Sequence, residues 1–117
     1  MSYKKRSPQI NLNEITWSKS EKVVARRAFD TAYKRECDSI IVKLKEMIVK
    51  VTKPEHIWRI HDYLTERLKQ INRNYDYRYS VLIFEFARLL QGGWLKLTDL
   101  EGLGEEKIEK IKKLASL

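Results

Sequence analysis

The side chains that could do catalytic chemistry in this sequence are few: one cysteine, Cys37, and two histidines, His56 and His61. Histidines five positions apart on a helix lie about 140° apart around its axis, so they do not face one metal ion. Cys37 has no histidine at helical spacing, and we expect it to be a small buried apolar residue rather than a nucleophile. The sequence therefore predicts no enzyme activity, no metal site and no cofactor.

A different kind of chemistry is suggested by Trp58, His61 and Asp62. Trp58 lies off the apolar stripe of a predicted helix, on the face that also carries Asp62, and His61 lies at the edge of that face. An exposed indole beside a carboxylate and an imidazole is typical of an anchor that binds another protein. The alternative is structural: Trp58 packs under a neighbouring helix or in a subunit interface, and Asp62 pairs with an arginine. The residue pattern leaves both open.

The third candidate is the segment Leu97–Ile111, which contains two glycines around Leu103. A glycine–apolar–glycine turn between helices resembles the helix-hairpin-helix motif, whose backbone N–H groups bind a DNA phosphate. A formal net charge of +8 fits that hypothesis. Three glutamates that flank the turn would repel a phosphate: Glu101, Glu105 and Glu106. We therefore prefer a glycine hinge between two packed helices, expect no nucleic-acid partner, and keep DNA binding as the alternative function.

The positive charge is concentrated in the first half of the chain. Residues 1–53 contain 13 basic and 6 acidic side chains, whereas residues 54–117 contain 11 and 10. A basic surface attracts nucleic acid, anionic lipid or acidic protein, or merely solvates a helix, and charge alone does not choose among these. A single cysteine cannot close an internal disulfide, which favours a reducing, cytoplasmic location. No apolar stretch approaches the roughly 20 residues of a membrane span, so we expect no membrane insertion.

Helices must position all of these residues. The motif Ser18-Lys19-Ser20-Glu21 has the spacing of a capping box and starts a helix predicted over residues 18–51. Pro54 starts a second helix, whose apolar stripe continues to Tyr75. A third helix is predicted over Asp76–Gln91, with apolar residues on most sides, and is ended by two glycines. A short helical turn at residues 98–101 and a last helix at residues 105–115 complete the pattern.

The predicted fold class is all-α, with a flexible basic arm at residues 1–16 and one helical domain at residues 17–117. We expect a long antiparallel helical hairpin, the stalk, at about residues 18–73, and a small helical head at about residues 75–117. A first helix of about 34 residues is about 50 Å long, whereas a compact domain of this size has a radius of gyration near 13 Å. Because one chain cannot cover such a helix, we predict a homodimer whose interface includes Ala32, Cys37, Ile40 and Ile41.

Two motifs on this helix plan are specific. Trp-x-x-His-Asp occupies residues 58–62, and Tyr-Asp-x-Arg-x-Ser-Val occupies residues 75–81. Together with residues 32–36 and 86–90, they make Trp17–Leu117 resemble the fluorescence recovery protein family of cyanobacteria. The resemblance implies an all-helical homodimer that acts as a non-enzymatic regulator of photoprotection. It would bind the photoactivated orange carotenoid protein, mainly through the C-terminal domain of that protein.

The resemblance also implies what such binding does and where. The regulator would speed the return of its partner to the resting orange form and promote detachment from the phycobilisome, near the cytoplasmic face of thylakoids. The carotenoid belongs to the partner. A relative that keeps the fold but binds another protein is a further alternative. The basic residue that the family has one helical turn after Asp62 falls on Leu68, and we expect the neighbouring Arg67 to replace it. The partner-binding positions are therefore expected at Trp58, His61, Asp62, Arg67, Phe84 and Lys110.

Overall fold

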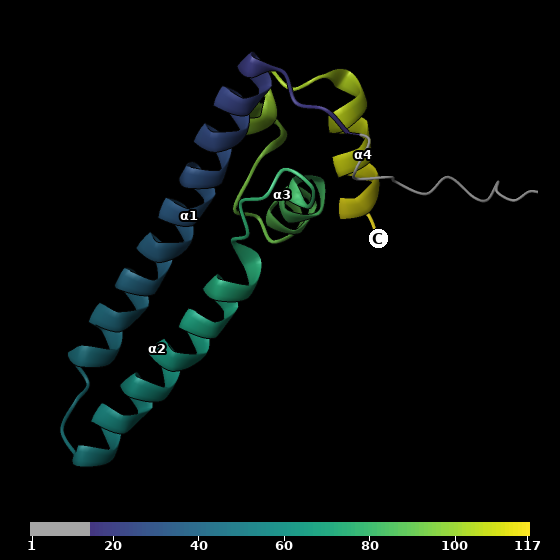
Figure 1. Cartoon of the computed structure of the whole chain (residues 1–117). Coiled ribbons are helices and arrows are strands. Elements are labelled where there is room, and N and C mark those ends of the chain that lie inside the picture. Colours follow the sequence, from purple (N-terminus) through teal and green to yellow (C-terminus); the bar gives the residue numbers. More distant parts are fainter. Residues whose placement is uncertain (1–14) are drawn as a thin grey trace, which may run out of the picture.

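The computed structural model describes residues 15–117, so most of the arm predicted over residues 1–16 lies outside the described residues. Within them, the chain forms five helical elements in the order α1 Lys19–Ile48, α2 Pro54–Asn74, α3 Leu82–Gln91, the 3₁₀-helix η3 Leu97–Leu100 and α4 Glu105–Ala115. The helices α1 and α2 form an antiparallel hairpin, and α3 and α4 pack beside one end of it (Figure 1). The all-α architecture of stalk and head is confirmed.

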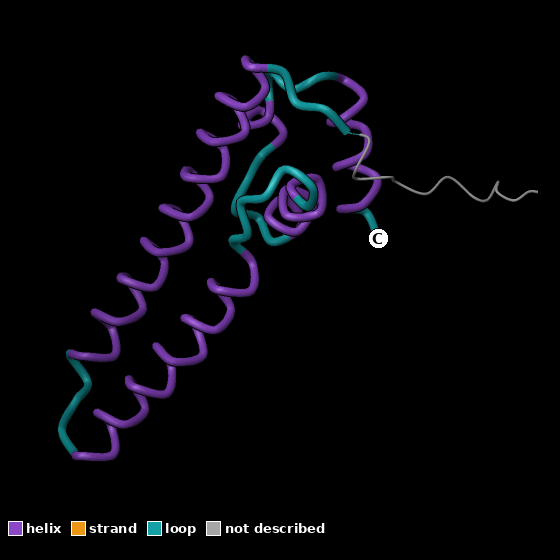
Figure 2. The backbone as a smooth tube through the Cα atoms, in the orientation of Figure 1, coloured by secondary structure: helices purple, strands orange, loops and turns teal. Residues whose placement is uncertain are grey.

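The molecule is elongated. Its radius of gyration is 18.2 Å and its principal extents are 65 × 33 × 21 Å, whereas a compact domain of this length has a radius near 13 Å. The difference comes from the stalk, which projects away from the head and ends in a short loop (Figure 2). No helix within residues 15–117 combines the length and the apolar character that crossing a membrane requires.

The start of α1 is determined by the capping box. The backbone N–H of Glu21 donates to Ser18 Oγ at 3.1 Å, and the Ser18 N–H donates to Glu21 Oε1 at 3.0 Å. These bonds satisfy two of the N–H groups that a helix start leaves unpaired. The helix ends at Ile48, three residues before the predicted end, and Pro54 begins α2 as predicted.

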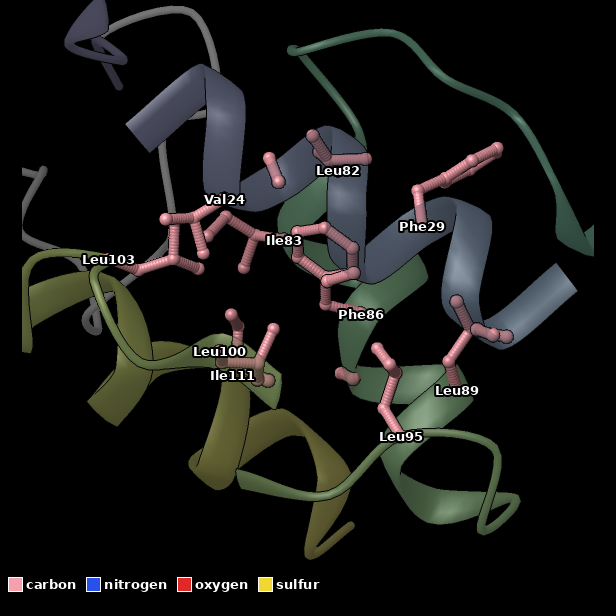
Figure 3. Close-up of a cluster of buried hydrophobic side chains, with 14 of the residues drawn as sticks. Val24, Phe29, Leu82, Ile83, Phe86, Leu89, Leu95, Leu100, Leu103 and Ile111 are labelled. Carbon is pink, nitrogen blue, oxygen red and sulfur yellow. The ribbon is translucent and has the colours of Figure 1, made fainter. Parts of the chain in front are cut away.

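The hydrophobic core lies in the head, between α3, the first half of α1 and α4. Four residues of α3 are at most 1% exposed: Leu82, Ile83, Phe86 and Leu89. They lie in one buried cluster with residues of α1, among them Val24 and Phe29 (Figure 3) and the small residues Ala25, Ala28 and Ala32. Burial of α3 on more than one face agrees with the prediction from its sequence. Ala32, which the sequence predicts in a dimer interface, is fully buried inside one chain.

The third helix begins at Leu82 rather than at Asp76. The residues before it form a loop because Tyr75 and Tyr77 set their rings edge-on against Phe29, with centroid distances of 5.4 Å and 4.8 Å. Asp76 and Arg78 form a local ion pair that holds the same loop. Two aromatic side chains pointing at one ring are incompatible with helical spacing at positions two apart. The two tyrosines therefore pack against α1.

Helix α1 holds the other elements with ion pairs along its first half. Glu21 contacts Lys107 of α4 at 3.0 Å, and Glu36 contacts Arg67 of α2 at 2.8 Å. Arg35 contacts Asp99 of η3 at 2.8 Å and also donates to the carbonyl oxygen of Trp94. All of these partners are far from α1 in sequence: Lys107 and Asp99 connect the stalk to the head, and Arg67 connects the two helices of the stalk.

Candidate functional site

Trp58, His61 and Asp62 come together on the surface of α2. Trp58 is 62% exposed, and the side chains of His61 and Asp62 are 67% and 82% exposed. Positions three and four apart share a helix face, so the imidazole lies edge-on to the indole at 6.4 Å and 3.5 Å from the carboxylate of Asp62. Trp58 does not pack under α3, and Asp62 has no arginine beside it among the described residues. The group presents an apolar ring and two polar ends to solvent, as a protein-binding anchor does.

Phe84 and Lys110 belong to the head. Phe84 lies on α3 and is 39% exposed, although its neighbours in that helix are buried. The side chain of Lys110 on α4 is 33% exposed, with its ammonium 3.7 Å from Glu106. The structure thus places the predicted positions in two groups, one on the stalk and one on the head. A partner that contacts both must extend along the molecule.

Arg67, predicted as a partner-binding position, contacts residues of its own chain. Its guanidinium donates to Glu36 at 2.8 Å and to Gln70 at 2.6 Å, and Glu36 is 2% exposed. The Tyr75 hydroxyl donates to the other oxygen of the same carboxylate at 2.9 Å, and burial together with this bond raises the pKa of Tyr75. Arg67 therefore joins α1 to α2 where the stalk meets the head, and its side chain is 22% exposed.

The glycine turn is packed against α1. A carboxylate oxygen of Glu21 accepts from the Gly104 N–H at 2.7 Å, and the carboxylate also pairs with Lys107. Gly102 has φ +107°, and a Cβ there would lie 2.7 Å from a methyl group of Val24. The protein's own carboxylate occupies the place that a DNA phosphate would take in a helix-hairpin-helix. The geometry favours the glycine hinge over the DNA-binding alternative.

The Glu21 contacts make stability depend on pH in acid. Burial by itself raises the pKa of Glu21, but hydrogen bonds from Ser18 and Gly104 and the Lys107 ammonium outweigh it and lower the pKa from 4.5 to about 2. A carboxyl with a lowered folded pKa stabilises the protein fully above its unfolded pKa, and this contribution is lost as the pH falls from about 4.5 to 2. We expect Glu21→Gln to lower the thermal unfolding midpoint at pH 7, with the deficit shrinking toward pH 2. The exposed Glu66→Gln is the control, and a deficit independent of pH would contradict the assignment.

Two carboxylates that join helices were not predicted from the sequence in that role. Glu21 was expected only to cap α1, and Glu36 was not expected to form a contact. Glu36 lies one turn after Ala32 on the buried face of α1. A carboxylate within an apolar stripe is the signal that could have found it, because a buried charge needs a partner. Within residues 15–117, no three His, Cys, Asp or Glu side chains gather in a way that could hold a metal ion.

Fold and surface together define an all-helical protein with an exposed aromatic and polar group on its stalk. The model of the family described as photoprotection regulator fluorescence recovery protein matches residues 17–115. The fluorescence recovery protein of Synechocystis sp. (strain ATCC 27184 / PCC 6803 / Kazusa) is 36% identical over 104 residues, which cover 89% of this chain and 95% of that relative.

Solved structures agree. The Fremyella diplosiphon fluorescence recovery protein superposes with a TM-score of 0.83 at 41% identity, covering 87% of this chain and all of the other. The Synechocystis structure gives the same TM-score and coverage at 36% identity. The chain belongs to the fluorescence recovery protein family, as the motifs predicted, and is a regulator of photoprotection.

Proposed function

We propose that this protein binds the photoactivated orange carotenoid protein, mainly at the C-terminal domain of that partner, and speeds its return to the resting orange form. It would also promote detachment of the partner from the phycobilisome, at the cytoplasmic face of thylakoids. Family membership supports the choice of partner. The single observation that carries the proposal is the exposed indole of Trp58 with His61 and Asp62 beside it, because exposed tryptophans in such settings dominate protein-binding energy.

The mechanism follows from binding alone. A protein that speeds the relaxation of a partner must bind the transition state of that relaxation better than the activated state. Holding two regions of the partner near their resting arrangement lowers the entropy lost on closure. In this proposal the stalk group around Trp58 makes the first contact, and Phe84 and Lys110 on the head guide reclosure. No bond is made or broken, so the protein needs no cofactor.

We also propose that the protein acts as a homodimer through the stalk. Its large exposed apolar residues support this, because eight of them lie between residues 41 and 68: Ile41, Val42, Ile48, Val49, Ile57, Trp58, Leu64 and Leu68. A monomer rarely leaves such a surface to water. Light scattering should give twice the 14.0 kDa chain mass, and Leu68→Glu should shift it toward monomer while Leu97→Glu on the head should not. A wild-type monomer at micromolar concentration would contradict the dimer.

The test of the function is a colour-recovery measurement. Illuminated, red carotenoid protein is mixed with this protein in darkness, and the return of the orange absorption is followed. We expect a faster return, and tighter binding to the red form than to the orange form. An unchanged rate would contradict the proposal and favour a family relative with another partner. A mobility shift of duplex DNA at low salt that is lost in a Gly104 variant would instead support the DNA-binding alternative.

A further inference from the structure

The free end of the stalk, defined here as residues 43–59, carries charge that the fold does not use. It contains two acidic residues, Glu46 and Glu55, and five basic residues: Lys43, Lys45, Lys50, Lys53 and Arg59. The ion pairs among the described residues all lie outside residues 39–60. In the head, by contrast, five of the seven arginines and lysines form ion pairs: Arg78, Arg88, Lys107, Lys110 and Lys112. The cations of the stalk end are thus available to something outside the chain.

A pocket of about 290 Å³ lies among these cations, between the end of α1 and the first turns of α2. Met47 and Ile60 are half-buried and provide its apolar part, whereas Lys50 and Arg59 are exposed at its rim. His56 completes the lining. The Thr52 N–H donates to its Nδ1 at 3.1 Å. The two charged side chains of the pocket, Lys50 and Arg59, are both hydrogen-bond donors, and no carboxylate lines it.

Hydrogen-bond donors around an apolar pocket are complementary to a ligand that carries carboxylates beside an aliphatic group. We propose that the stalk end is a docking site for an acidic segment of a partner protein, with an aliphatic side chain in the pocket and carboxylates on Lys50 and Arg59. Charge complementarity selects an acidic occupant. A segment of protein matches this mixture, since one occupant supplies both carboxylates and aliphatic groups.

The experiment uses the full-length protein and a fluorescein-labelled peptide, Glu-Leu-Glu-Glu-Leu-Glu, with anisotropy measured at low salt. We expect saturable binding that weakens as salt is added, because exposed charge pairs are screened. The peptide with glutamine at every glutamate should not bind. Lys50→Glu with Arg59→Glu should lower the affinity by at least about tenfold, an effect typical of losing two complementary charges. Lys50→Gln with Arg59→Gln should lower it less, and provides a second variant if the first unfolds.

The matched control changes the same charge elsewhere. Lys19→Glu with Arg27→Glu alters two exposed basic residues at the head end of α1, and binding should stay within about twofold of wild type. Equal loss in both double variants would overturn the site in favour of general charge attraction. Two other results would also overturn it: tighter binding to anionic phospholipid vesicles than to peptide, or a change of oligomeric mass in the stalk-end variant, which would make the occupant a second copy. Because no carotenoid protein is used, failure here leaves the proposed function standing.

Discussion

Trp58→Ala should slow the return of the orange form by at least about tenfold at a limiting concentration of this protein, while its helix content stays unchanged. Truncating a central anchor of an interface costs about 2 kcal/mol or more, which corresponds to about 30-fold in affinity. The indole is 62% exposed and contributes little to the packing of one chain. Trp58→Ala should therefore weaken binding and slow the return of the orange form without changing the folding of the chain. Absorption spectroscopy in darkness and circular dichroism measure the two quantities.

Two variants sharpen this result. Val23→Ala removes an apolar side chain that is also 62% exposed, but at the head end of α1, and should leave recovery unchanged. Phe84→Ala should slow recovery as well, because the head contact is needed for reclosure in the proposed mechanism. The oligomeric mass of Trp58→Ala must be measured alongside, since the residue also lies on the apolar surface of the stalk. Near-normal recovery in both Trp58→Ala and Phe84→Ala would refute the site.

Glu36→Ala is expected to have the largest effect on stability, lowering the free energy of unfolding by about 3 kcal/mol or more. Removing one partner of a buried ion pair leaves the other charge uncompensated, and such changes typically cost about 3–5 kcal/mol. Here both Arg67 and the Tyr75 hydroxyl would lose their acceptor. Against a total stability of about 5–15 kcal/mol for a small domain, the change is severe. Urea denaturation followed by circular dichroism measures it.

A double-mutant cycle separates this pair from the packing around it. Glu36→Gln and Arg67→Met are measured singly and together, and coupling of at least about 1 kcal/mol is expected for a buried charged contact. Glu66→Gln on the exposed face of α2 is the control and should stay within about 0.5 kcal/mol of wild type. Independent, additive effects of the two changes would show that Glu36 and Arg67 do not act as a pair.

Most of the fold is local in origin and could be predicted. The capping box at Ser18, Pro54 at the start of α2 and glycine after α3 each act within a few residues, so the sequence alone indicates where those helices begin or end. The start of α3 could not be predicted in this way. Tyr75 and Tyr77 have acceptable helix propensity, and contacts with residues about 40 or more positions earlier, Phe29 and Glu36, help to keep them in a loop.

The candidate site likewise contains residues that local sequence patterns predict and residues whose roles depend on distant packing. Exposure of Trp58 follows from its position off the apolar stripe of one helix, which periodicity detects. The roles of Ala32 and Arg67 depend on which helix covers α1, and that is decided by distant packing. Ala32 was assigned to a dimer interface because α1 is apolar over its full length. The head covers the first half of that stripe, so only later positions such as Ile41 remain open to a second chain.

Because its long-range ion pairs lie between residues 21 and 36, one part of the continuous helix α1 is more stable against local opening than the other. Opening of residues 21–36 requires loss of the core and of the pairs to α2, η3 and α4, so we expect their backbone amides to exchange with solvent more slowly than those beyond residue 39. Beyond residue 39 the helix lacks such ties and can fray from its loop end without disturbing the head. In a single chain, the stalk is therefore more stable near the head than at the loop end of α1. If a partner ordered this loop end of the stalk on binding, the chain would lose conformational entropy at that step. A second copy of the chain that had already ordered the same end would remove this cost from partner binding.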